Sequence, residues 1–256
     1  MPNKEEKQKN NSKAVKRFLW IGFFGLVALF LLATWIRFLF TEKLSIYQSG
    51  EYAVQGVDVS YYQGEIDWEV LGGQIDFAFM KATEGSSHTD LRFEENRSGA
   101  LENDVICGAY HFFSFESSGE TQAENYIRVV GSWDGMLPPV VDVEYYSVEE
   151  AITVEEEQIR EELRRMLLAL EEYYGVKPII YATLQSYYSI LDGEFDEYPL
   201  WIRNTYFAPT PLIPNWDFWQ YCDEGELSGY GGESRYIDLN VYAGTREELD
   251  SIRIWQ

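Results

Sequence analysis

Residues 138–146, with the sequence PPVVDVEYY, combine a short apolar strand with two carboxylates at its carboxyl end. Side chains two residues apart on a strand leave the same face, so Asp142 and Glu144 are expected to point into one space, about 7 Å apart at Cα. Two carboxyl groups held that close do not both ionise cheaply, and one pKa is expected to rise. General-acid cleavage of a glycosidic bond needs such a protonated carboxyl near neutral pH. The alternative is a strand end with two solvated acids, and the rest of the chain has to decide between the two.

Further apolar segments flank this one along the chain. The predicted strands are 56–59, 77–82, 105–112, 139–144, 178–182, 200–203, 218–221 and 237–242. Their near-continuous apolar character is typical of parallel strands covered on both faces. Strands that alternate with helical segments predict an α/β fold, a (β/α) TIM-like barrel. Residues 55–256 are close to the lower size limit of that fold, about 200 residues, so the later helices are expected to be short or missing.

Three segments between the strands are predicted to be helical: 93–103, 119–130 and 153–174. The last is the clearest, because apolar residues recur in it at helical spacing. Thr153 followed by Glu156 forms a capping-box pattern at its start, and Gly175 is expected to stop it.

The N-terminal part of the chain differs from the rest. Residues 1–17 form a polar, Lys-rich tail, and 18–36 are uncharged and apolar, about 28 Å long as a helix and close to the thickness of a bilayer core. We therefore expect a cytoplasmic basic tail over 1–17, a transmembrane signal anchor over 18–41 and a linker over 42–54. The rest of the chain would then be extracellular, held at the cell membrane by a single helix. A cleaved signal peptide is the alternative, against which the length of the apolar run and the bulky Trp35 argue.

Charge is unevenly distributed along the 256 residues. The whole chain carries a formal net charge of −23, and because residues 1–42 hold seven Lys or Arg and three acids, the remainder carries −27. Such a charge excludes nucleic acid as a partner, since phosphate binding needs clustered Lys and Arg. Aromatic residues make up 16% of the chain, and aromatic faces are the usual platform for sugar rings.

Acidic residues recur on the predicted strands at the rim where barrel chemistry gathers. Asp58 on the first strand and Asp238 on the last join Asp142 and Glu144. The first and last strands are neighbours in a closed barrel, so Asp58 and Asp238 are expected to lie close together, across the mouth from Asp142 and Glu144. A ring of four carboxylates costs stability through mutual repulsion, and such a cost usually signals function.

Six segments, in order along the chain, carry a resemblance to a known family. They are 56–64 (GVDVSYYQG) with 66–68 (IDW), 79–85 (FMKATEG), 108–113 (GAYHFF), 141–144 (VDVE), 219–221 (WQY) and 238–240 (DLN). Together they resemble glycoside hydrolase family 25, the N,O-acetylmuramidases or lysozymes of bacteria and phages, over about residues 55–243. The resemblance implies a muramidase domain over 55–256 that uses no cofactor. Its substrate would be the peptidoglycan glycan strand, cut at the β-1,4 bond between N-acetylmuramic acid and N-acetylglucosamine during cell-wall remodelling.

The resemblance also implies a role for each of the four acids. Glu144 would be the general acid that protonates the glycosidic oxygen of the leaving sugar. Asp142 would assist the substrate's own 2-acetamido group or the developing oxocarbenium ion. Asp58 and Asp238 match the family's other two acidic positions and would tune charge and orient the substrate. A retaining, an inverting and a substrate-assisted outcome all stay open.

Six further residues are candidate substrate contacts. Four are aromatic, one is an amide and one is a cation near the carboxylates: Tyr110, Tyr181, Trp201, Trp219, Gln63 and Lys81. Each also has a structural interpretation: core packing for the aromatics, a loop contact for the amide, an ion pair for the lysine. Residues 203–206 (RNTY) depart from the family pattern, in which a small residue and then aromatics often follow the Trp-Ile pair of the seventh strand.

Other site chemistries find no support in the sequence. The chain has two histidines, and His111 has no companion ligands at metal-binding spacing, so no zinc site is expected. Ser60 has no nearby histidine base, which argues against a nucleophilic triad. Cys107 and Cys222 fall at opposite ends of the predicted barrel and are expected to be unpaired thiols.

Two alternatives to a membrane-anchored muramidase stay open at this point. One is a catalytically inactive sugar-binding or scaffold barrel at the cell surface, against which the retention of all four acids argues. The other is a soluble secreted lysin, which would result from cleavage after the apolar run.

Overall fold

The computed structural model describes residues 4–41, 44–132, 134–147, 155–210 and 212–255. The chain divides into two compact units, Met1–Leu44 and Ser45–Gln256. The described part of the first unit is one long helix, α1 (Lys4–Thr41). Its stretch Lys16–Arg37 is long and apolar enough to cross a membrane, by length and composition.

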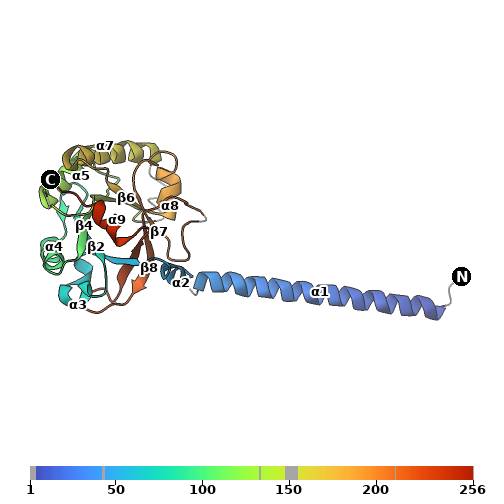
Figure 1. Cartoon of the computed structure of the whole chain (residues 1–256). Coiled ribbons are helices and arrows are strands. Elements are labelled where there is room, and N and C mark those ends of the chain that lie inside the picture. Colours follow the sequence, from blue (N-terminus) through green and yellow to red (C-terminus); the bar gives the residue numbers. More distant parts are fainter. Residues whose placement is uncertain (1–3, 42–43, 133, 148–154, 211, 256) are drawn as a thin grey trace. The chain divides into compact units, whose positions relative to one another are not determined.

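The second unit is built on a closed eight-stranded barrel (Figure 1). The strands are β1 (Val54–Val59), β2 (Phe77–Glu84), β4 (Ile106–Phe112), β5 (Val140–Val143), β6 (Ile179–Thr183), β7 (Leu200–Arg203), β8 (Phe218–Gly225) and β9 (Ile237–Tyr242). They are hydrogen-bonded in the order β1-β9-β8-β7-β6-β5-β4-β2, and the pairing of β1 with β2 closes the ring. A two-residue strand, β3 (His88–Thr89), adds to the edge of β2. The predicted α/β barrel is confirmed.

The prediction of parallel strands is wrong for β9. This strand runs antiparallel to both of its neighbours, β1 and β8. No helix separates β8 from β9, so the chain turns back directly beside itself, as only antiparallel neighbours allow. The amino end of β9 therefore lies at the rim where the other barrel strands end.

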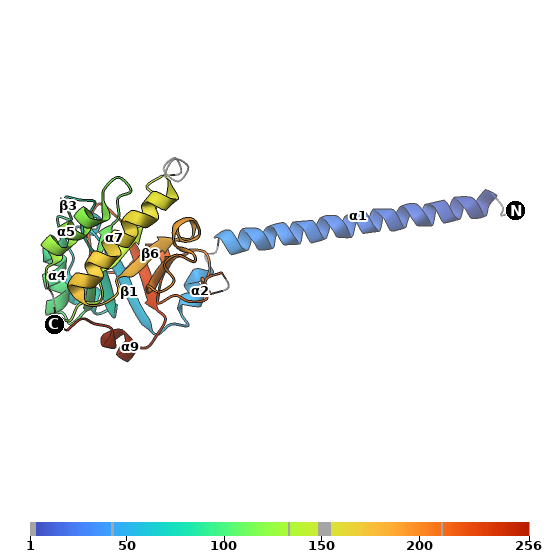
Figure 2. The ribbon, with the colours of Figure 1, turned by 90° about the horizontal axis from the view of Figure 1, so that it is seen from above.

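Helices cover the outside of the barrel (Figures 1 and 2). They are α3 (Trp68–Gly72), α4 (Phe93–Glu102), α5 (Gly119–Val130), α7 (Glu156–Tyr174), α8 (Leu184–Ser186) and α9 (Arg246–Ser251), with single turns η1 (Tyr61–Gln63) and η2 (Tyr187–Leu191). Only α8 and η2 connect β6 to β7, in keeping with the prediction of short later helices. Gly175 ends α7 in the left-handed conformation, at φ 73°, as predicted. The predicted capping residue Thr153 lies outside the described residues.

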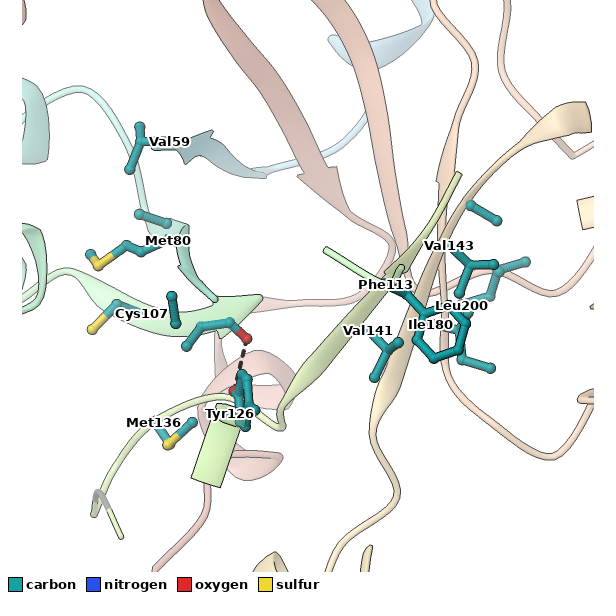
Figure 3. Close-up of a cluster of buried hydrophobic side chains, with 14 of the residues drawn as sticks. Val59, Met80, Cys107, Phe113, Tyr126, Met136, Val141, Val143, Ile180 and Leu200 are labelled. Carbon is teal, nitrogen blue, oxygen red and sulfur yellow. Dashed lines mark hydrogen bonds between the residues drawn. The ribbon is translucent and has the colours of Figure 1, made fainter. Parts of the chain in front are cut away.

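Strand alternation sorts the core into two clusters. Val59, Met80 and Val141 belong to the outer cluster, which packs between the strands and the helices (Figure 3). In that cluster the hydroxyl of Tyr126, from α5, donates a hydrogen bond of 3.0 Å to the carbonyl of Ala109 in β4. The inner cluster fills the barrel, and Phe79 and Trp201 stack across it with ring centroids 4.6 Å apart.

The segment predicted as a linker is largely part of the folded domain. From Ser45 onward the chain belongs to the second unit, and Ser45–Ser49 forms a short helix, α2, whose two serines are buried. Cys107 and Cys222 are both buried and form no disulfide, as expected from their predicted positions at opposite ends of the barrel.

Candidate active site

A cavity of about 710 Å³ opens at the rim where the parallel strands end. Nine of the ten residues predicted for the site line it: Asp58, Gln63, Lys81, Tyr110, Asp142, Glu144, Tyr181, Trp201 and Asp238. They come from β1, β2, β4, β5, β6, β7 and β9 or from the turns that follow the strands. The barrel therefore gathers residues that are up to 180 positions apart in the sequence.

Trp219 is the exception, and its prediction as a sugar contact needs correction. It lies on β8 between Phe218, which packs inside the barrel, and Gln220, which lines the cavity. Because side chains alternate along a strand, Trp219 must face outward. It is fully buried in the outer cluster, and its indole Nε1 donates to the carbonyl of Asn204 at 2.8 Å.

Asp142 and Glu144 come from the end of β5. Asp142 is 7% exposed, and Glu144, one residue beyond the strand, is half-buried. Burial raises the pKa of the Asp142 carboxyl well above its usual range, and the negative charge of Glu144 raises it further. Burial also raises the pKa of Glu144, against the positive charge of Arg203. Two such carboxyls titrate as a pair, and this pair retains a proton to higher pH than solvated acids do.

Asp58 and Asp238 form a second pair, directly opposite each other on β1 and β9. Burial raises the pKa of Asp238 to about 9, and the charge of Asp58 adds to the effect. Burial also raises the pKa of Asp58, opposed by hydrogen bonds from Asn240, Gln220 and Asp238. The expected proximity of Asp58 and Asp238 is confirmed.

Two amide side chains hold the Asp58 carboxylate. The Nε2 of Gln220 donates to Asp58 Oδ1 at 2.8 Å, and the Nδ2 of Asn240 donates to the same oxygen at 2.7 Å. The hydroxyl of Tyr181 donates to Gln220 Oε1 at 2.9 Å, and the indole of Trp201 donates to Asn240 Oδ1 at 2.9 Å. Tyr181 and Trp201 thus orient the partners of Asp58 while their rings line the cavity.

The remaining predicted contacts are also tied into the wall. The Nζ of Lys81 lies 2.6 Å from Glu84 Oε2 and 4.9 Å from the centre of the Phe112 ring. Gln63 is buried; its Oε1 accepts from the Ser60 amide, and its Nε2 donates to the Tyr236 carbonyl. Tyr110 is half-buried at the cavity. Lys81 therefore forms the ion pair, and Gln63 the loop contact, that the sequence left open as structural alternatives. Both residues also line the cavity.

Several cavity residues escaped the sequence-based prediction. Arg203 and Asp223 form an ion pair of 2.6 Å, Tyr62 comes from η1, and Glu233, Ser234 and Tyr236 come from the loop between β8 and β9. Strand parity could have found Arg203, because it lies two residues after Trp201 on β7 and shares its face. No local pattern marks the loop residues.

A second cavity of about 350 Å³ adjoins the first. Glu144 and Arg203 line both cavities. The second cavity is also lined by Tyr145, Thr183, Leu184, Gln185, Asn204, Thr205 and Tyr206. Glu144 thus lies where the two cavities meet. A polymer that passed from one into the other would cross this carboxyl.

The site can perform proton chemistry at an extended polar ligand. The two carboxyl pairs line the same cavity as Arg203 and Lys81, so protonated and ionised acids can coexist in it. In the part of the chain that the structure describes, no group of three or more His, Cys, Asp or Glu side chains is arranged to hold a metal ion.

Comparisons with known proteins agree with this geometry. The model of glycosyl hydrolases family 25 matches residues 57–230. Uncharacterized protein YegX of Escherichia coli strain K12 is 36% identical over 217 residues, which cover 82% of this chain and 77% of that protein. Lysozyme M1 of Streptomyces globisporus is 31% identical over 210 residues, covering 77% and 70%. A solved family 25 glycosyl hydrolase from Bacillus anthracis has a TM-score of 0.73 and 44% identity, covering 78% of this chain and 94% of that one. The chain belongs to glycosyl hydrolases family 25.

Proposed function

We propose that this chain is a peptidoglycan muramidase. It hydrolyses the β-1,4 bond between N-acetylmuramic acid and N-acetylglucosamine. The observation that carries the proposal is the position of Glu144, which lines both cavities and shares one of them with Asp142, Asp58 and Asp238. A relative named as a lysozyme, Lysozyme M1, supports the same substrate class.

In the proposed reaction Glu144 protonates the glycosidic oxygen as the leaving sugar departs. Its half-buried position and raised pKa suit an acid that must still hold its proton near neutral pH. Asp142 stabilises the positive charge that develops at the sugar ring or on the 2-acetamido group. Asp58, whose carboxyl is held by Gln220 and Asn240, orients the substrate from the opposite wall. Lys81, through its ion pair with Glu84, and Gln63, through its hydrogen bonds, hold the cavity wall in shape. Tyr110, Tyr181 and Trp201 line the part of the cavity in which the sugar chain binds.

We further propose that α1 anchors the domain to the cell membrane, with the N-terminus cytoplasmic and the barrel outside. The length and composition of Lys16–Arg37 support a spanning helix. The six basic residues before Phe18 support this orientation. The alternative of a cleaved leader predicts a different mature N-terminus, so N-terminal sequencing of the exported protein distinguishes the two. Recovery of the intact chain in carbonate-washed membranes is the expected result.

The central experiment measures turbidity loss of purified peptidoglycan with the detergent-solubilised chain and its Glu144→Gln variant. Clearing by the wild type, with a loss of about 10²-fold or more in the variant, is expected from the removal of acid catalysis. Tyr173→Ala is a matched control, because Tyr173 is an exposed residue of α7 that lines neither cavity. Equal activity of the wild type and Glu144→Gln would refute the role of Glu144. Binding without clearing by both would favour the inactive sugar-binding barrel.

A further inference from the structure

We propose that α2, the short helix that directly follows the apolar segment, is a positioning element for the substrate groove. It holds the loop 204–208, whose residues 204–206 form one wall of the second cavity beside Glu144. The proposal rests on the muramidase function, since the groove matters only if a glycan binds there. It assigns Ser45 and Gln48 a part in catalysis that acts through the loop and not through contact with substrate.

Three hydrogen bonds join α2 to the loop. The Ser45 amide donates to the Tyr206 carbonyl at 2.9 Å, and the Ser45 hydroxyl donates to the Thr205 carbonyl at 2.8 Å. The Ala208 amide donates to Gln48 Oε1 at 2.7 Å. Ser45 is fully buried, so its two bonds are shielded from water.

The loop depends on these bonds because it belongs to no helix or strand. It connects β7 to β8, where a regular barrel of this kind would place a covering helix. Buried backbone groups outside regular structure need other partners, and leaving one without a partner costs free energy. For Thr205, Tyr206 and Ala208 those partners come from α2, and for Asn204 the carbonyl partner is Trp219.

The same residues face the groove. Asn204, Thr205 and Tyr206 line the second cavity together with Glu144. Ser45 holds the carbonyls of Thr205 and Tyr206 from behind, which fixes how far this wall stands from the Glu144 carboxyl. A displacement of about 1 Å in a substrate-positioning wall can cost up to 10²-fold in rate.

The position of α2 in the sequence adds a consequence. Ser45 lies four positions after Thr41, the end of α1. The segment that ties the domain to the apolar helix is therefore the one that braces the groove wall. A proteolytic cut that removed residues 45–49 would both release the domain and loosen its substrate groove.

The test uses the full chain in detergent and three variants. Gln48→Ala removes the acceptor of the Ala208 amide, Gln48→Glu retains an acceptor oxygen, and Tyr47→Ala changes a neighbouring side chain that is 73% exposed. The measurements are hydrogen exchange of the Ala208 amide, kcat and KM on soluble peptidoglycan fragments, the pH profile, and the melting temperature.

For Gln48→Ala we expect exchange at Ala208 to accelerate by about tenfold or more and KM to rise by about fivefold, since a wall of the groove has become mobile. The pH profile should stay unchanged and the melting temperature should change little, because an amide in this loop can regain a partner from water by local opening. This outcome separates positioning from a general loss of stability. Gln48→Glu should restore KM, and Tyr47→Ala should match the wild type.

Two results would overturn the proposal. Faster exchange with an unchanged KM would mean that the contact exists without positioning the groove. An equal rise of KM in Tyr47→Ala would mean that any change in α2 has the same effect. An inactive wild type would refute the muramidase function itself, and this inference with it; an active wild type separates the two failures.

Discussion

Asp238 is the residue at which the cost of the acidic site is best measured. Its pKa is raised to about 9, so between about pH 4 and 9 the folded chain holds a proton that the unfolded chain has lost. The contribution of Asp238 to the free energy of unfolding therefore falls as pH rises through this window. Asparagine has the same shape and does not ionise, and its amide can still donate to Asp58.

We expect Asp238→Asn to melt higher than the wild type at pH 8, corresponding to about 1 kcal/mol or more, and the gain to shrink towards pH 5. Peptidoglycan clearing should fall in the same variant, as is common when a strained functional site is relieved. Melting curves from pH 5 to 9 measure the first effect. A variant that melts lower than the wild type throughout this range would mean that Asp238 is ionised in the fold and stabilised by Arg203.

His111 contributes a pH dependence of the opposite sign. It is fully buried on β4, with Nδ1 2.8 Å from Thr83 Oγ1 and Nε2 3.0 Å from Gln122 Oε1. Gln122 Oε1 already accepts from the Ser114 amide, so the hydrogen-bond network assigns the proton to Nε2 and leaves Nδ1 as the acceptor for Thr83. Burial lowers the pKa of His111 to about 4.

Below about pH 6.5 the unfolded chain binds a proton at His111, whereas the buried ring in the folded chain stays neutral. The free energy of unfolding therefore falls as pH is lowered towards 4, by roughly 3 kcal/mol in total. Denaturant unfolding of the wild type and His111→Gln between pH 7 and 4 measures this loss. The variant is expected to be less stable at pH 7 and to lose less on acidification. Parallel pH dependences would contradict the burial of a neutral ring.

Helices α5 and α7 pack with their backbones in close contact at Gly119. A Cβ placed there would lie 1.9 Å from the Glu162 carbonyl oxygen and 2.8 Å from the Met166 nitrogen. We expect Gly119→Ala to destabilise the domain by about 1–3 kcal/mol, because one helix has to shift. Gly73→Ala is the control, since its Cβ would meet nothing closer than 3.6 Å. Equal melting temperatures for the two variants would contradict this packing.

The sequence predicts the positions of the barrel strands correctly, but it does not predict the direction of the last strand, β9. Each predicted strand overlaps a real one, because apolar runs bounded by polar segments are a local signal. The direction of β9 is not local: it depends on the missing helix after β8, and an apolar strand looks the same in either direction. The predicted position of Asp238 at the rim is nevertheless correct, since the reversed strand brings its amino end there.

The alternation of side chains along each strand explains why most predicted site residues line the cavity and why Trp219 does not. Asp142, Tyr181 and Trp201 each lie two residues before another cavity residue, which is Glu144, Thr183 and Arg203 respectively. Trp219 alternates with Gln220 and points outward. Parity can be counted from sequence once one residue of a strand is assigned to the site. The contacts of Ser45 with the loop 204–208 could not be predicted, because they join segments 160 residues apart and end on backbone carbonyls, which every residue carries.

For the whole molecule, the net charge of −27 after residue 42 governs the approach to the wall. Anionic wall polymers repel such a domain over a distance set by salt, with a Debye length of about 30 Å at 10 mM and about 8 Å at 150 mM. On walls that retain anionic polymers we expect KM to fall several-fold as NaCl rises from about 10 to 150 mM. On walls stripped of these polymers KM should change little, and kcat should stay constant on both substrates. Turbidity assays on the paired wall preparations measure this difference. The same salt dependence on both would locate the effect in the acidic cleft and not in the charge of the domain as a whole.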